Sequence, residues 1–187
     1  PRQQIVRMAE MFADSSRSYM MGVGTTYYVA SISQYYFSEL ADCYYSALSS
    51  DEFSVVDIKR GDMVLAISQS GETYDTKTAL VSAKKRGAKT AAIVNVMGSA
   101  ISMMVDQVIM QGSGPEICVV STKAALAQTF IMVRVAVELG LIRKKIKLKD
   151  YKKYQKEMQE FSEIIEIVLN EQSGFVRNIA RDTSHVK

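Results

Sequence analysis

The feature that most restricts the fold of this chain is an apolar run followed by a hydroxyl-rich loop and then a helical pattern. Residues 63–67 are apolar without interruption, and a turn signal at residues 59–62 precedes them. A run of that length is typical of a strand that is buried on both faces of a sheet. After the loop around Gly71, the chain shows helical spacing, cations in the last turn and Gly87 as a stop signal. The stretch therefore predicts strand, loop and helix, with the helix beginning at the hydroxyls.

The same alternation extends along most of the chain. Further strands are predicted at residues 18–23, 43–48, 89–94 and 107–110. Helices are predicted at residues 2–13, from Val29 to Leu40, at residues 99–104 and at residues 124–139, the last ended by Gly140. Short apolar strands that alternate with helices are the mark of a parallel sheet covered on both faces. We therefore predict an α/β fold, a three-layer α/β/α sandwich with a five-stranded parallel sheet.

Length and composition narrow the class of protein. With 187 residues, 48% of them hydrophobic, the chain can bury a sizeable core as one domain, followed by a helical extension over residues 141–187. The formal net charge of +3 does not require a nucleic-acid partner. No apolar run approaches membrane length and no signal peptide precedes the domain, which predicts a soluble, cytoplasmic protein without membrane contact. Because the chain opens at Pro1 and not at an initiator Met, we expect it to be a piece of a longer protein.

The loop after the central strand has the character of an anion site. A helix N-terminus presents unpaired N–H groups and partial positive charge. Four side chains of the loop add hydrogen-bond donors, namely Ser68, Gln69, Ser70 and Thr73. Dinucleotide loops rely on bare glycine backbone and P-loops on a Gly-Lys-Ser/Thr sequence, and this loop has neither, which favours a single terminal phosphate. The alternative is that Ser70 and Thr73 only cap the helix.

A second turn with hydroxyls lies at the carboxyl end of the first predicted strand, where parallel sheets bind ligands. Gly22 and Gly24 precede Thr25 and Thr26, but Tyr27 occupies the third glycine position of the dinucleotide fingerprint. For this turn by itself, capping by Thr25 or Thr26 is the favoured interpretation.

A third loop covers residues 112–123. Its Gly-Ser-Gly-Pro sequence forces a non-helical path, and Ser121 or Thr122 caps the helix that follows. Capping does not explain the acidic residue between apolar neighbours at residues 115–117.

Together the three loops resemble a known family. The residues that carry the likeness are Ser68-Gln69-Ser70-Gly71-Glu72-Thr73 with Asp75-Thr76, Gly24-Thr25-Thr26, and Gly114-Pro115-Glu116-Ile117 with Val119-Val120-Ser121-Thr122-Lys123-Ala124. In order and spacing they are similar to the first sugar isomerase (SIS) domain of the glucosamine-6-phosphate synthases, the glutamine:fructose-6-phosphate aminotransferases. The chain departs from the family pattern at Val23, Thr26 and Cys118, which are usually Cys, Ser and Gly.

The resemblance implies a flavodoxin-like SIS domain over residues 1–140 that binds fructose 6-phosphate, glucose 6-phosphate or glucosamine 6-phosphate. By analogy, the phosphate is held by Ser68, Gln69, Ser70, Thr73 and Thr26. The sugar is lined by Thr25, Val119 and Ser121. The resemblance further implies a homodimer, and a glutaminase domain and a second SIS domain that are absent from this chain.

No catalytic group, cofactor or metal site is identifiable in the sequence. Moving a proton between C1 and C2 of a sugar requires a positioned base, and the single histidine, His185, lies far from the motifs. In the family, the isomerising Glu, Lys and His belong to the second SIS domain. Glu72 at a helix N-terminus is interpreted as structural, and Glu116 is retained as a hypothetical base. Cys43 and Cys118 have no metal-ligand spacing and are expected to be free thiols.

The extension and the function leave alternatives open. Residues 143–156 are rich in lysine, and the apolar residues that follow one another at alternating three and four spacing predict a helix with one seam: Tyr151, Tyr154, Met158, Phe161, Ile165 and Val168. A solvated lysine face is favoured over a nucleic-acid surface. The chain is either a binding domain of an isomerising aminotransferase that does not turn sugar phosphate over alone, or a stand-alone SIS-type aldose-ketose isomerase or sugar-phosphate-sensing domain.

Overall fold

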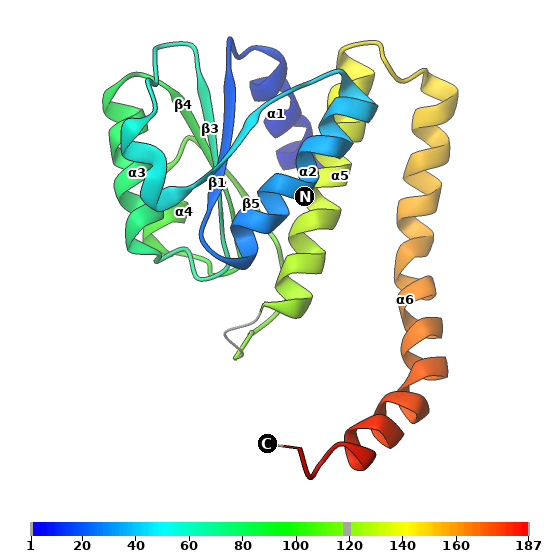
Figure 1. Ribbon diagram of the computed structural model, residues 1–187. Coiled ribbons are helices and arrows are strands. Elements are labelled where there is room, and N and C mark those ends of the chain that lie inside the picture. The colour runs from blue at the N-terminus through cyan, green and yellow to red at the C-terminus, as the bar shows by residue number, and fades with distance from the viewer. Residues whose placement is uncertain (1, 118–120, 187) are drawn as a thin grey trace. The chain divides into compact units, whose positions relative to one another are not determined.

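The computed structural model describes residues 2–117 and 121–186 of the chain. It divides into two compact units, Pro1–Lys147 and Leu148–Lys187, and each is described by itself. In the first unit a parallel sheet lies between two layers of helices (Figure 1). This arrangement confirms the predicted α/β/α sandwich.

The sheet contains the predicted strands in the order β2-β1-β3-β4-β5, and neighbouring strands are parallel throughout. Their bounds are β1 (Ser18–Gly22), β2 (Ser46–Ser49), β3 (Met63–Ser68), β4 (Lys89–Val94) and β5 (Gln107–Met110). This is the flavodoxin-like strand order, in which the chain leaves β1 in one direction and returns on its other side with β3.

The second strand begins later than predicted, at Ser46 and not at residue 43. The apolar character of the preceding residues has another cause, because Cys43 and Tyr45 are buried in the core before the ladder begins. The Tyr45 ring packs edge-on against Phe37, and its hydroxyl donates a hydrogen bond to the Ala30 carbonyl. Apolar residues at this position therefore fill the core without joining the sheet.

Two cores form on the two faces of the sheet. Helices α1 (Arg2–Ala13), α2 (Thr25–Ala41) and α5 (Thr122–Ile142) cover one face. The short 3-10 helix η1 (Ser50–Val55) and helices α3 (Tyr74–Lys85) and α4 (Ala100–Met104) cover the other (Figure 1). Along β3, Leu65 and Ile67 point into the first core, while Val64 and Ala66 point into the second. This alternation shows why the run at residues 63–67 is apolar at every position.

Gly140 has a different role from the predicted one. The prediction that it ends the last helix of the sandwich is wrong, because α5 continues to Ile142. A Cβ at Gly140 would collide with the carbonyl oxygen of Leu40 in α2 and press on Ile146. The glycine is therefore required by the close crossing of α5 and α2.

Helix α5 is also longer and more apolar than the sequence analysis allowed. Among the described residues it is the one helix whose length and composition would suffice to cross a membrane, so the statement that no apolar run approaches that length is wrong. Half of this apolar stretch of the helix is buried inside the protein. Its buried side chains, such as Met132 and Val135, belong to the core that α1 and α2 share.

The second unit is the single helix α6 (Leu148–Asp182), which confirms the helix predicted in the extension. Its lysines form ion pairs one turn apart, from Lys153 to Glu157 and from Lys156 to Glu160, and they are largely exposed. These exposed pairs agree with a solvated lysine face, and the choice of that face over a nucleic-acid surface stays a prediction.

Candidate functional site

The candidate site lies at the carboxyl ends of β1 and β3, where the strand order reverses. These two strands are direct neighbours, with Met21 opposite Ala66, although they lie far apart along the chain. The loops that follow them are therefore brought together at the same edge of the sheet. Open parallel sheets bind ligands in the crevice at such a point.

A cavity of about 430 Å³ opens between these loops, within the size range of small-molecule sites. Its lining residues are Val23, Gly24, Thr25, Thr26, Ser68, Gln69, Ser70, Thr73 and Ser121. Every residue predicted for the site belongs to this lining except Val119, which lies outside the described residues. The third loop, distant in sequence, reaches the cavity through Ser121.

Three helices begin at the cavity. Its lining includes the N-cap residue of α2, Gly24, that of α3, Thr73, and that of α5, Ser121. None of the three makes a side-chain capping hydrogen bond. Because the first N–H groups of a helix lack partners inside the helix and carry the positive end of its dipole, three such ends at one cavity favour an anion. For Thr73 and Ser121, simple capping does not explain the hydroxyl.

The loop between β3 and α3 is held by its own hydroxyls. The Ser68 hydroxyl accepts a hydrogen bond from the Gly71 amide at 3.1 Å and shares another with the Thr73 hydroxyl at 3.1 Å. Ser70 accepts from the Glu72 amide at 3.2 Å. Gly71 has a positive φ of 68°, and a Cβ there would collide with the Ser99 side chain. The loop thus requires glycine at this position for both its conformation and its contact with the start of α4.

The turn between β1 and α2 is shaped by Thr26. Its hydroxyl accepts a hydrogen bond from the Val23 amide and donates one to the Val23 carbonyl, each at 2.9 Å. A side chain at Gly22 would collide with Thr26. The structure places Thr26 in the lining with its hydroxyl engaged in the turn, and the neighbouring Thr25 half-buried at the same cavity.

The two acidic residues of the loops are both engaged at helix N-termini. Glu72 accepts from the Ala100 amide at 2.7 Å and pairs with the Lys77 ammonium at 3.2 Å. The Ala100 hydrogen bond, followed by that of Lys77, holds the pKa of Glu72 below its usual value, and the structural interpretation of this residue is confirmed. The Glu116 carboxylate accepts from the Ala124 amide at 2.8 Å and so satisfies a first-turn N–H of α5.

A set of amides was missed by the sequence analysis. Gln128 of α5, Gln111 after β5 and Asn95 after β4 are joined by hydrogen bonds through Ser113. The signal that could have identified them is a glutamine in the apolar stretch of residues 124–139. Of this set, Asn95 also borders a second cavity of about 740 Å³, which lies beside the candidate site and shares Gln69 with it.

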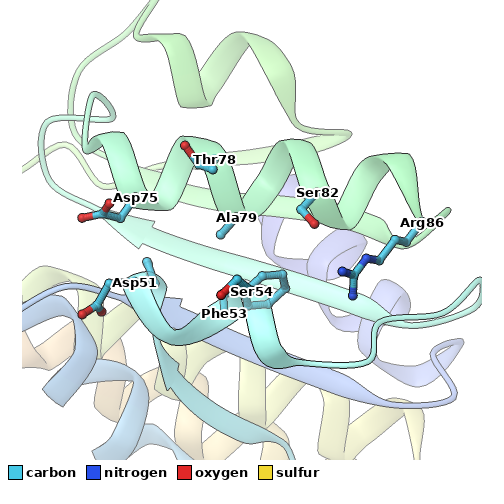
Figure 2. A pocket seen from close by; sticks show the side chains of 9 residues that line it. Asp51, Phe53, Ser54, Asp75, Thr78, Ala79, Ser82 and Arg86 are labelled. Atoms are coloured by element: carbon cyan, nitrogen blue, oxygen red, sulfur yellow. The ribbon is translucent and has the colours of Figure 1, made fainter.

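A third cavity, between η1 and α3, is smaller, at about 210 Å³. Figure 2 shows Asp51 and Asp75 at one end of it and Arg86 at the other. Two of the charged groups around it have partners within the fold, because Asp51 bonds to Ser49 and Arg86 donates to the Val56 carbonyl at 2.6 Å.

Charged side chains and metal-binding side chains are few among the described residues of the candidate site. None of the described residues that line the 430 Å³ cavity is ionised at neutral pH. Within residues 2–117 and 121–186, no group of three or more His, Cys, Asp or Glu side chains is placed to hold a metal ion. Cys43 is free and buried, and burial raises the pKa of its thiol. Cys118 lies outside the described residues.

The chain is similar in sequence to known enzymes. The chain is 37% identical over 182 residues to the glutamine–fructose-6-phosphate aminotransferase (isomerizing) of Methanocaldococcus jannaschii, in a match that covers 96% of this chain but 16% of that protein. It is 34% identical over 178 residues to the enzyme of the same name from Fusobacterium nucleatum, a match of 94% of this chain and 29% of that protein. The chain therefore spans less than a third of the length of these relatives.

A solved structure and a family model give the remaining comparisons. The C-terminal domain of the glucosamine-fructose-6-phosphate aminotransferase from Francisella tularensis superposes with a TM-score of 0.85 at 24% identity, over 96% of this chain and 51% of that one. This likeness shows the fold. The model of the SIS domain family matches residues 11–138, which include both strand ends, all three helix starts and the cavity between them. The chain belongs to the SIS domain family.

Proposed function

We propose that this chain is a sugar-phosphate-binding SIS domain of an isomerising glutamine:fructose-6-phosphate aminotransferase. The ligand is fructose 6-phosphate, glucose 6-phosphate or glucosamine 6-phosphate. Its phosphate is held by Ser68, Gln69, Ser70, Thr73 and Thr26. Its sugar is lined by Thr25, Val119 and Ser121.

The observation that carries the proposal is the meeting of three helix N-termini at one hydroxyl-lined cavity. Neutral donors and helix dipoles suit a terminal phosphate, which offers acceptor oxygens on every side. The names of the relatives support the class of ligand, because fructose 6-phosphate appears in the names of the enzymes from Methanocaldococcus jannaschii and Fusobacterium nucleatum.

The proposed domain binds its ligand without turning it over. Isomerisation requires a base within hydrogen-bond reach of the sugar carbons, and the described residues that line the cavity include no carboxylate and no imidazole. The nearby Glu116 already accepts a backbone hydrogen bond from Ala124. Turnover is thus assigned to other parts of the longer enzyme, for which we propose a glutaminase domain and a second SIS domain. A homodimer and a cytoplasmic location belong to the same proposal.

Calorimetric titration of the 187-residue chain tests the proposal. Fructose 6-phosphate should bind, fructose without its phosphate should show at least roughly tenfold weaker affinity for the loss of hydrogen bonds to a charged group, and inorganic phosphate should compete. Equal affinity for fructose and fructose 6-phosphate would contradict the phosphate assignment.

A second candidate function is a stand-alone isomerase or a sugar-phosphate-sensing domain. A turnover assay of the same chain with fructose 6-phosphate separates the isomerase from the binding domain. We expect ligand binding without formation of glucose 6-phosphate, and measurable isomerisation would favour the stand-alone isomerase.

A further inference from the structure

A chain of amide hydrogen bonds connects the core to the loops of the site. The Gln128 amide nitrogen donates to the Gln111 side-chain oxygen at 2.8 Å, and Gln111 donates in turn to the Ser113 hydroxyl at 2.8 Å. The Ser113 amide and hydroxyl both donate to the Asn95 side-chain oxygen, at 3.1 and 3.2 Å. Asn95 then donates to the Gly114 carbonyl at 2.7 Å. We call these residues the amide chain.

The amide chain contacts one residue of the ligand cavity, Gln69, and the loop that leads to α5. The backbone N–H of Asn95 donates to the carbonyl of Gln69, in the loop between β3 and α3, at 3.1 Å. On the other side, Ser113 and Gly114 begin the loop in which Glu116 bonds to the Ala124 amide, two residues into α5. One end of the amide chain therefore lies in the core, and the other bonds to Gln69 and to the described part of the loop before α5.

Gln128 is costly for the core in which it lies. Its side chain is fully buried, and within the described residues its amide oxygen has no hydrogen-bond partner. A buried polar atom without a partner destabilises the folded state, and an apolar side chain of similar size would avoid that cost. Because stability alone would favour an apolar residue here, Gln128 is expected to contribute something else, and the side-chain hydrogen bond that it makes among the described residues leads towards the site.

We propose that Gln128 is a positioning residue for the ligand cavity, acting through Gln111, Ser113 and Asn95 on the loops that carry Gln69 and Ser121. This inference rests on the proposed function, because it assigns the amide chain to the same cavity. It does not make Gln128 a ligand contact, since Gln128 does not belong to the cavity lining.

The test is the variant Gln128→Leu in the full chain, with Gln128→Met as a second variant of unbranched shape. The melting temperature should be unchanged or raised, since the unpartnered oxygen is removed. The Ser113 amide should exchange with solvent faster, and fructose 6-phosphate should bind more weakly, each by roughly 2- to 10-fold for the loss of one hydrogen bond. Thr129→Val is the matched control, because among the described residues the Thr129 hydroxyl bonds within α5, to the Ala125 carbonyl, and it should leave exchange and affinity unchanged.

The outcomes separate the two proposals. A lowered melting temperature with unchanged Ser113 exchange in both Gln128 variants would show a purely structural residue and overturn the inference. Faster exchange with unchanged affinity would overturn the link to the cavity. If the unsubstituted chain fails to bind both fructose 6-phosphate and inorganic phosphate, the proposed function fails, while the exchange measurement still decides whether Gln128 positions the loop.

Discussion

At the scale of single residues, the hydroxyls of the candidate site differ in how much of their hydrogen-bonding capacity remains. Ser68 is buried and shares its hydrogen bond with Thr73, which is only half-buried. If Ser68 donates to Thr73, the Thr73 proton is directed to the cavity. Thr26, by contrast, both accepts from and donates to the Val23 backbone. Thr73 and Ser70 are therefore the side chains best placed to reach a phosphate.

This difference predicts which substitutions weaken ligand binding. Ser70→Ala or Thr73→Val should weaken binding of fructose 6-phosphate by roughly 10- to 100-fold, since a hydrogen bond to a charged group contributes about 1.5 to 3 kcal/mol. Isothermal titration calorimetry measures the change. Wild-type affinity in both variants would remove these two side chains from the phosphate site.

Sequence patterns identify residue types at the site better than they identify partners. The hydroxyls of the loops could be predicted because short polar side chains at a strand-to-helix junction either cap the helix or bind an anion at its N-terminus. The engagement of Thr26 with Val23 could not, because it depends on the close approach that Gly22 permits. Gln128 was missed because its partner, Gln111, lies after another element of the fold, 17 residues away in the sequence.

At the scale of helices and strands, the predictions succeeded where periodicity and burial agree. Strand β4 has the predicted bounds, and the run at residues 63–67 forms β3, because both strands are buried along nearly their whole length. The errors lie at ends. Gly140 matches the pattern of a helix stop but is required by a helix crossing, and Cys43 and Tyr45 fill the core before β2 begins. A local pattern does not distinguish a side chain that ends an element from one that contacts a neighbour.

The helix crossing predicts opposite effects for two glycine-to-alanine changes. Gly140→Ala should lower the free energy of unfolding by about 1 to 3 kcal/mol, because the added methyl overlaps the Leu40 carbonyl. In Gly174→Ala the methyl meets nothing within 4 Å in α6, so helix propensity should stabilise α6 by about 0.5 to 1 kcal/mol. Denaturant unfolding of the first and helical circular dichroism of the second measure the effects. Equal tolerance of both changes would contradict the crossing.

The start of α4 predicts a dependence of stability on pH. The Ala100 hydrogen bond, together with Lys77, lowers the pKa of folded Glu72 below its ordinary value of 4.5. The charged carboxylate therefore stabilises the fold above about pH 4.5, and this contribution is lost as the pH falls through the folded pKa. In Glu72→Gln this acid-dependent part should be absent, so the melting temperatures of the two proteins should converge in acid. A constant difference between neutral and acidic solution would contradict the assignment.

At the scale of the whole molecule, the strand order explains why three separate sequence segments form one site. Reversal of the strand order at β1 places the carboxyl ends of β1 and β3 side by side, and α5 adds the third loop. The alternation of strands and helices predicted the layers but not the strand order, since order depends on which strands pair. The family resemblance supplied the flavodoxin-like order, and the observed sheet agrees with it.

The absence of ionised groups from the described lining has a consequence for the pH and salt response of the molecule. Peptide dipoles do not titrate, so between about pH 7 and pH 9 the affinity for fructose 6-phosphate should be flat, and a decline in acid should follow the second ionisation of the ester at about pH 6. Added potassium chloride should weaken binding less than in a lysine- or arginine-lined pocket, and titrations at several ionic strengths measure this. Such a domain would bind its ligand equally well as the pH rises above about 7, where a receptor that depends on a protonated histidine loses its charge.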